Sequence, residues 1–101
     1  MGADVTLELK GRTALITGAS QGLGLAIARA YVSAGADVLI CGRTPKDLEQ
    51  ARKLLVSESL PEQVIVAYVA DVSKPREVEA LVAQAVSVFP RLHILVNNAG
   101  V

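Results

Sequence analysis

Four short apolar runs, separated by stretches long enough for a helix, constrain the fold of this 101-residue chain more than any other feature. They are Thr13–Thr17, Asp37–Cys41, Val64–Val69 and His93–Val96. Each run is continuously apolar rather than alternating, which is typical of strands that are covered on both faces. Strands joined by helices of this length are parallel, with right-handed crossovers. The sequence therefore predicts an α/β fold, half of a doubly wound parallel sheet in the order β-α-β-α-β-α-β.

Local signals mark where the intervening helices begin and end. Thr44 and Ser73 each supply a hydroxyl for an N-cap just before a proline in the first turn. The first helix, predicted over 23–34, is followed by Gly35 at the C′ position, and Pro90 ends the third helix. That third helix carries apolar residues at helical spacing, and we expect this whole face to be buried: Val78, Leu81, Val82, Ala85, Val86 and Phe89.

Composition excludes several functional classes. The chain is 51% hydrophobic, enough for one domain with a core, and its 10 basic and 10 acidic residues give a net charge of zero. Neither nucleic-acid binding nor attraction to a membrane surface is indicated. The N-terminus lacks the pattern of a secretory signal, and no apolar run is long enough to span a membrane. Cys41 is the only cysteine, so we expect no internal disulfide, no metal site and a cytoplasmic location.

A glycine-rich turn follows the first apolar run directly. Its sequence is Thr17-Gly18-Ala19-Ser20-Gln21-Gly22-Leu23-Gly24, and it leads into a helix. The backbone of such a turn can approach a pyrophosphate, whose charge is met by N–H groups and by the positive end of the helix dipole. We expect Gly18 to make the turn, Gly22 to leave room for a phosphate and Gly24 to allow close packing. The alternative is a turn without a ligand, but its place inside a β-α-β unit favours the phosphate site.

Two further motifs follow later strands. Asp71 comes just after the third apolar run, and Asn97-Asn98-Ala99-Gly100 follows the fourth. Together with Thr17-Gly18-x-x-x-Gly22-x-Gly24, they resemble the classical short-chain dehydrogenase/reductase family, from about Leu9 to Val101. All three lie at the strand ends where open α/β sheets bind ligands. The resemblance implies a partial Rossmann fold with strand order 3-2-1-4, in which residues 1–101 form the N-terminal part of one dinucleotide-binding domain.

The resemblance also implies roles for individual residues. The turn would hold the phosphates and the adenosine ribose of a dinucleotide, through Gly18, Ser20, Gln21, Gly22, Leu23 and Gly24. Asp71 would accept a hydrogen bond from the exocyclic amine of adenine, and the Val72 backbone would contact a ring nitrogen. Asn98, Ala99 and Gly100 would lie beside the ribose, with Thr17 bracing their loop. The alternatives are a capping carboxylate at Asp71 and an Asx turn at the asparagines.

The cofactor is predicted from the end of the second apolar run. Members of the family that prefer NAD commonly have an acidic residue there, whereas this chain has Gly42 followed by Arg43. A guanidinium offers a planar fork of donors that suits a 2′-phosphate. NADP(H) is therefore favoured over NAD(H). The alternative for Arg43 is a solvated loop residue, and Gln21 is not the basic residue that many NADP-preferring relatives carry in the glycine turn.

No catalytic residue is assigned. The family uses a serine and a tyrosine with a lysine four residues later, but neither Tyr31 nor Tyr68 has that lysine and the chain ends at Val101. We therefore expect an NADP(H)-binding N-terminal fragment of an oxidoreductase that transfers hydride between nicotinamide and an alcohol or ketone. The alternative is a truncated chain that binds a nucleotide or a partner subunit without catalysis. A homo-oligomer is implied for the full-length form, and the isolated chain is expected to be weakly stable or self-associating.

Overall fold

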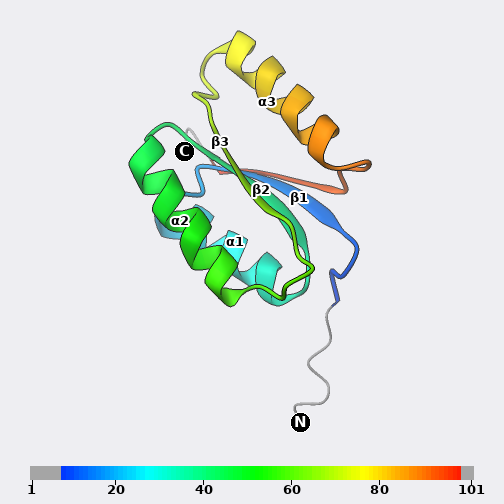
Figure 1. Cartoon of the computed structure of the whole chain (residues 1–101). Coiled ribbons are helices and arrows are strands. Elements are labelled where there is room, and N and C mark those ends of the chain that lie inside the picture. Colours follow the sequence, from blue (N-terminus) through cyan, green and yellow to red (C-terminus); the bar gives the residue numbers. More distant parts are fainter. Residues whose placement is uncertain (1–7, 99–101) are drawn as a thin grey trace.

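The computed structural model describes residues 8–98 and shows strands and helices in strict alternation (Figure 1). The strands are β1 (Thr13–Thr17), β2 (Asp37–Gly42), β3 (Ile65–Val69) and β4 (Ile94–Asn97). The helices are α1 (Gly22–Ser33), α2 (Pro45–Glu58) and α3 (Pro75–Val88). All strand pairs are parallel, and the sheet order is β3-β2-β1-β4. The predicted α/β fold and strand order are confirmed.

Side chains of the two central strands alternate between two separate cores. Ala14 and Ile16 of β1 join the core that includes α1 and α2, together with their neighbours on β2. Leu15 points the other way, into the core formed with Leu81 and Phe89 of the α3 segment. Figure 1 shows the same division, with α1 and α2 on one side of the sheet and α3 on the other. For β1 and β2, the prediction of strands covered on both faces is therefore confirmed.

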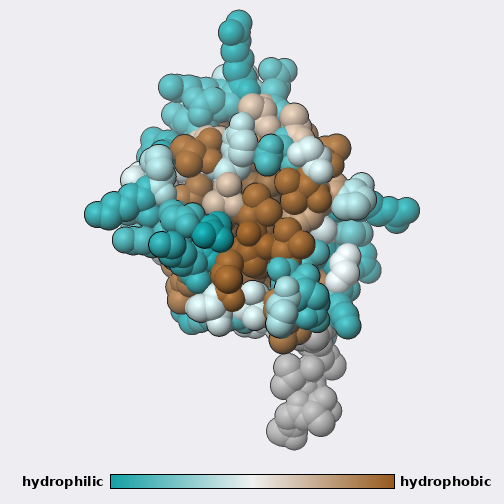
Figure 2. All heavy atoms as spheres, in the orientation of Figure 1, coloured by the Kyte–Doolittle hydropathy of each residue, from teal (hydrophilic) through white to brown (hydrophobic). Residues whose placement is uncertain are grey.

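The prediction of coverage on both faces is wrong for β3, and β4 is the open apolar edge that the expected self-association requires. Residues of β3 are mostly half-buried, and β4 alternates between half-buried and exposed residues, with Leu95 64% exposed. Among the described residues both strands lie at edges of the four-stranded sheet, so each has a neighbouring strand on one side only. In Figure 2, apolar atoms are visible on the face between α2 and α3, over the edge formed by β3.

The prediction that one whole face of α3 is buried also needs correction. Leu81 and Ala85 are buried, as is Phe89 just beyond the helix, but Val82 is 46% and Val86 62% exposed. The apolar face of α3 is therefore wider than the part of it that packs against the sheet. Among the described residues, α3 is the only helix on its side of the sheet. No second helix within residues 8–98 packs against the flank of α3 that carries these two valines.

The ends of the helices agree only partly with the sequence signals. Gly35 follows α1 with a φ of 96°, which confirms its C′ position. Thr44 is the N-cap of α2, but its side chain makes no capping hydrogen bond. Ser73 is not the N-cap of α3, because Lys74 occupies that position. The Ser73 hydroxyl instead donates to the charged Asp71 carboxylate at 2.7 Å.

The end of the sheet opposite the glycine turn is closed by side chains. Nδ1 of His93 accepts the Thr13 N–H at 3.1 Å, and the Thr13 hydroxyl donates to the Arg91 carbonyl. The amide of Gln63 donates to the carbonyls of Val32 and Ala36 at 3.0 and 2.7 Å. These contacts fix the amino ends of the strands, which leaves the carboxyl ends as the open edge. Within residues 8–98, no helix is both long and apolar enough to cross a membrane.

Candidate functional site

The carboxyl ends of all four strands border one cavity of about 670 Å³. It is lined by residues from the ends of β1, β2 and β3, from the start of α2, from α3 and from β4. The predicted site residues that line it are Gly18, Ser20, Gln21, Arg43, Asp71, Val72 and Asn98. Gly22, Leu23 and Gly24 begin α1 and are not part of this lining. Ala99 and Gly100 lie outside the described residues.

The glycine turn adopts a backbone that its glycines permit. Gly18 and Gly22 have φ values of 63° and 60°, a region that is unfavourable for other residues. A Cβ atom added to Gly24 would lie 1.9 Å from the Gly18 carbonyl oxygen and 2.8 Å from Nδ2 of Asn98. Space around Gly22 is open, with nothing within 4 Å of an added Cβ. Gly18 and Gly22 thus provide the left-handed backbone of the turn, Gly22 also leaves free space beside it, and Gly24 allows close packing.

No side chain within residues 8–98 caps the N-terminus of α1. Its N-cap residue is Gln21, which makes no side-chain capping hydrogen bond, and the first turn contains no acidic residue. The first N–H groups of a helix have no acceptor within the helix and carry the positive end of its dipole. This helix end therefore offers donors and partial positive charge to an anion next to the glycine turn.

A threonine joins the glycine turn to the asparagines that follow β4. The Thr17 hydroxyl lies 3.1 Å from Oδ1 of Asn97 and accepts the Asn98 N–H at 3.0 Å. Nδ2 of Asn98 donates to the Gly18 carbonyl at 3.3 Å. The brace that we predict between Thr17 and the asparagine loop is thus present as far as residue 98. It fixes the ends of β1 and β4 against each other.

Asp71 organises the turn between β3 and α3. Its Oδ1 accepts hydrogen bonds from the Ser73 N–H at 2.9 Å and from the Ser73 hydroxyl at 2.7 Å. These two bonds, and then the positive charges of Arg43 and Lys74, hold the pKa of the Asp71 carboxyl below its usual value. The group is thus a carboxylate, and hence a pure acceptor, at neutral pH. It stabilises the turn before α3 without being the helix N-cap.

Glu77 belongs to this turn as well, although it is not among the predicted site residues. Its Oε1 accepts the Asp71 N–H at 2.7 Å, and its Oε2 lies 3.7 Å from Nζ of Lys74. One signal could have found it. A glutamate at the third position of a helix often reaches back to a backbone N–H before the helix, and Glu77 is third after Lys74.

The end of β2 contributes the basic residue of the cavity. Arg43 is exposed and follows Gly42, where an added Cβ would contact Leu48 and Ser20 at 3.4 and 3.6 Å. Asp47, in the first turn of α2, also lines the cavity, so charges of both signs are present. Burial raises the pKa of the Cys41 thiol to about 11, which makes this cysteine a weak donor rather than a nucleophile.

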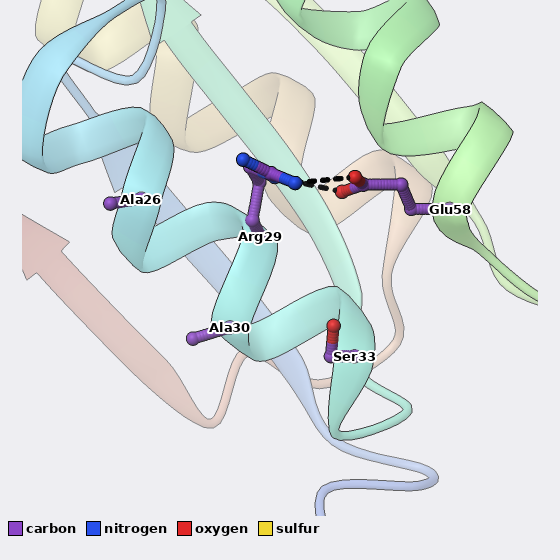
Figure 3. Close-up of a pocket in the computed structure, with 5 residues that line it drawn as sticks. All are labelled: Ala26, Arg29, Ala30, Ser33 and Glu58. Carbon is purple, nitrogen blue, oxygen red and sulfur yellow. Dashed lines mark hydrogen bonds and ion pairs between the residues drawn. The ribbon is translucent and has the colours of Figure 1, made fainter.

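A second cavity, of about 420 Å³, lies on the outer surface of α1 and α2 (Figure 3). Arg29 and Glu58 point toward each other across it, with bonds of 2.9 and 2.7 Å between the guanidinium and the carboxylate. Ala26, Ala30 and Ser33 complete the lining. Because the two charges satisfy each other and no predicted site residue lies here, we interpret this cavity as part of the contact between α1 and α2.

Known proteins with the same arrangement are numerous. A family model described as short chain dehydrogenase matches residues 12–101. An L-fucose dehydrogenase from Bos taurus is 38% identical over 90 residues, which are 89% of this chain and 31% of that protein. A D-beta-hydroxybutyrate dehydrogenase from Cupriavidus necator is 37% identical over 93 residues, covering 92% of this chain and 35% of that protein.

A solved structure gives the same result for the fold. L-sorbose reductase from Gluconobacter frateurii, in complex with NADPH and L-sorbose, superposes with a TM-score of 0.87 at 35% sequence identity. The match covers 94% of this chain and 35% of that one. This chain therefore spans about a third of the length of the relatives that it matches.

Proposed function

Because the chain belongs to the short-chain dehydrogenase family, we propose that residues 1–101 form the NADP(H)-binding, N-terminal part of an oxidoreductase. The observation that carries this proposal is the convergence of three features on one cavity. These are an uncapped helix N-terminus beside a glycine turn, a cation after β2 and a carboxylate after β3. Their charges and hydrogen-bonding groups are complementary, in that order, to the pyrophosphate, the ribose phosphate and the adenine of a dinucleotide.

The chain's own residues would hold the adenosine half of the cofactor. The first N–H groups of α1, including that of Leu23, would donate to the pyrophosphate, and Ser20 and Gln21 would face the adenosine ribose. Asp71 and Val72 would hold the adenine ring, and residues 98–100 would lie beside the second ribose. When bound, the nicotinamide supplies or accepts the hydride that family members exchange with an alcohol or ketone.

We further propose a preference for NADP(H) over NAD(H). Support comes from Gly42, which presents no carboxylate to repel a 2′-phosphate, and from the exposed guanidinium of Arg43 at the cavity. The Thr44 hydroxyl makes no capping bond at the start of α2, so it is a further donor for this phosphate. The NADPH in the L-sorbose reductase structure shows that a relative of this fold takes the phosphorylated cofactor.

The preference is tested by exchanging the charge at the end of β2. Arg43→Asp removes a charge-assisted hydrogen bond and adds repulsion, so the affinity for NADPH relative to NADH should fall at least about tenfold. Fluorescence titration with both cofactors measures this ratio. Arg76→Asp is the matched control, because Arg76 is exposed on α3 and does not line the cavity. An unchanged ratio in Arg43→Asp would exclude the assigned role.

Hydride transfer is proposed for a protein of the length of the relatives, of which this chain is about a third. The alternative is a chain that binds a nucleotide or a partner subunit without turnover. The reading frame after the codon for Val101 separates the two: a serine followed by Tyr-x-x-x-Lys supports the oxidoreductase. NADPH oxidation by the encoded protein with a panel of carbonyl compounds then tests the activity, and binding without turnover would favour the alternative.

A further inference from the structure

The turn that carries Asp71 is held from two sides. On one side, Oδ1 of Asp71 accepts both hydrogen bonds from Ser73. On the other side, the Asp71 N–H donates to Oε1 of Glu77 at 2.7 Å, the length of a charge-assisted bond. The bond spans six residues and ties the end of β3 to the first turn of α3. The backbone of Asp71 and its carboxylate are therefore both fixed before any ligand arrives.

This arrangement leaves one acceptor free for a ligand. Among the described residues, both hydrogen bonds to the Asp71 carboxylate are made to Oδ1, and none is made to Oδ2. Asp71 lines the cavity, and its lowered pKa keeps it ionised. Oδ2 is thus an oriented acceptor, and its direction is set by the same turn that Glu77 holds.

We propose that Glu77 is a positioning residue for adenine recognition. It acts through the turn that carries Asp71 and does not touch the cofactor. This inference rests on the proposed function, in which Asp71 and Val72 hold adenine. The half-buried Glu77 fixes the Asp71 N–H. Through this bond it also fixes the position of the Asp71 carboxylate and of the Val72 amide. Without this acceptor, the Asp71 N–H must seek another partner and the turn loses its fixed geometry. The loss falls on the adenine subsite rather than on the phosphate subsite at α1.

Two conservative variants separate the effect of the length of the Glu77 side chain from the effect of its charge. Glu77→Asp keeps the charge and the preference for a helix N-terminus, but its side chain is one methylene shorter and cannot reach the Asp71 N–H in the present geometry. Glu77→Gln loses the charge and the Lys74 pair but keeps an oxygen at the same distance. Glu79→Asp makes the same shortening at an exposed glutamate of α3 and is the matched control.

The experiment compares the dissociation constants of NADPH and of its hypoxanthine analogue, in which a carbonyl replaces the exocyclic amine. The unmodified chain should bind NADPH about tenfold more tightly than the analogue. In Glu77→Asp this preference should fall to about twofold. Glu77→Gln and Glu79→Asp should keep it. The Asp71 amide proton, followed by NMR without cofactor, should keep its hydrogen-bonded shift in Glu77→Gln and move in Glu77→Asp.

The outcomes distinguish this inference from the proposed function. If the unmodified chain discriminates and Glu77→Asp discriminates equally well, Glu77 has no positioning role while the proposed function stands. If Glu77→Gln loses the preference and Glu77→Asp keeps it, charge rather than hydrogen bonding acts, and the inference is wrong. If the unmodified chain does not discriminate, or does not bind NADPH, the proposed adenine contact fails and this inference fails with it.

Discussion

At the scale of the residue, the glycine turn shows two different reasons for having no side chain. Gly22 needs its glycine for backbone conformation, since its φ is 60° and the space around it is open. Gly24 needs its glycine for contact, because an added Cβ would lie 1.9 Å from the Gly18 carbonyl oxygen. A backbone oxygen cannot rotate away as a flexible side chain does. The two positions should therefore respond differently to the same substitution.

We predict that Gly24→Ala is the more damaging of the two. It should lower the free energy of unfolding by about 3 kcal/mol and abolish NADPH binding, because the turn must open to accept the methyl group. Gly22→Ala should cost about 1 kcal/mol, for the left-handed backbone alone. Urea unfolding with a cofactor titration checks both variants. Equal effects of the two substitutions would contradict the steric explanation.

Some features of the site could be predicted from residue patterns and others could not. The glycine spacing, Asp71 and Arg43 are predictable because each follows the end of an apolar strand, and such ends share one edge of a parallel sheet. Glu77 is missed because it lies six residues beyond Asp71 and on a helix, where a charged residue is normally solvated. Its role depends on the direction of the turn, which local periodicity does not describe.

At the scale of the element, interiors were predictable and boundaries were less so. The apolar runs define β1 and β2 because burial on both faces leaves no position for a polar residue. The residue at which a helix starts depends on which of several nearby acceptors receives the hydrogen bond of a hydroxyl or amide group. Ser73 prefers the Asp71 carboxylate over the cap of α3, and Thr44 makes no capping bond at all. A sequence shows that these donors exist but not which bond each one makes.

The ion pair between α1 and α2 gives a prediction about pH and salt. The hydrogen bonds from Arg29, and then its charge, hold the pKa of Glu58 below its ordinary value of 4.5. The stabilisation from this pair is therefore present above about pH 4.5 and is lost as pH falls through the lowered pKa. The denaturant midpoints of the unmodified chain and of Glu58→Gln should differ slightly at pH 7 and converge in acid.

The pair is half exposed, so its contribution should be small and sensitive to screening. In about 1 M salt the difference between the two midpoints should shrink even at pH 7. Glu79→Gln is the control, because Glu79 is exposed on α3 and forms no ion pair with a described residue. A difference that is the same at neutral and acid pH would show that Glu58 acts through packing instead.

At the scale of the whole molecule, the two sides of the sheet are covered unequally. Within residues 8–98, α1 and α2 pack on one side and α3 on the other, and the apolar residues left exposed along α3, β4 and the segment between them are Val82, Val86, Leu92 and Leu95. β4 is also an edge strand, with backbone groups that no described strand pairs on its outer side. The continuity of the apolar runs predicts that helices cover both faces of the sheet. It does not show which strands and helices are left partly uncovered in this chain.

We predict that the isolated chain associates with itself through this surface. Sedimentation should give a mass that increases with concentration, and Leu95→Lys should lower it, because it places a charge at a 64% exposed edge position. Val56→Lys, at a 45% exposed position on α2, should leave the mass unchanged. A monomer at all concentrations, with a sharp unfolding transition, would contradict this prediction.

The path of the chain through the sheet also orders the events of folding. β1, β2 and β3 are neighbours in sequence and in space, whereas β4 returns past both β2 and β3 to pair with β1. The contacts of Thr17 with Asn97 and Asn98 join residues 80 and 81 positions apart, so closing them carries a large loss of chain entropy. We therefore expect the first three strands to assemble early and the asparagines to arrive late. A newly made chain would then acquire its fold in large part before it acquires a complete ligand site.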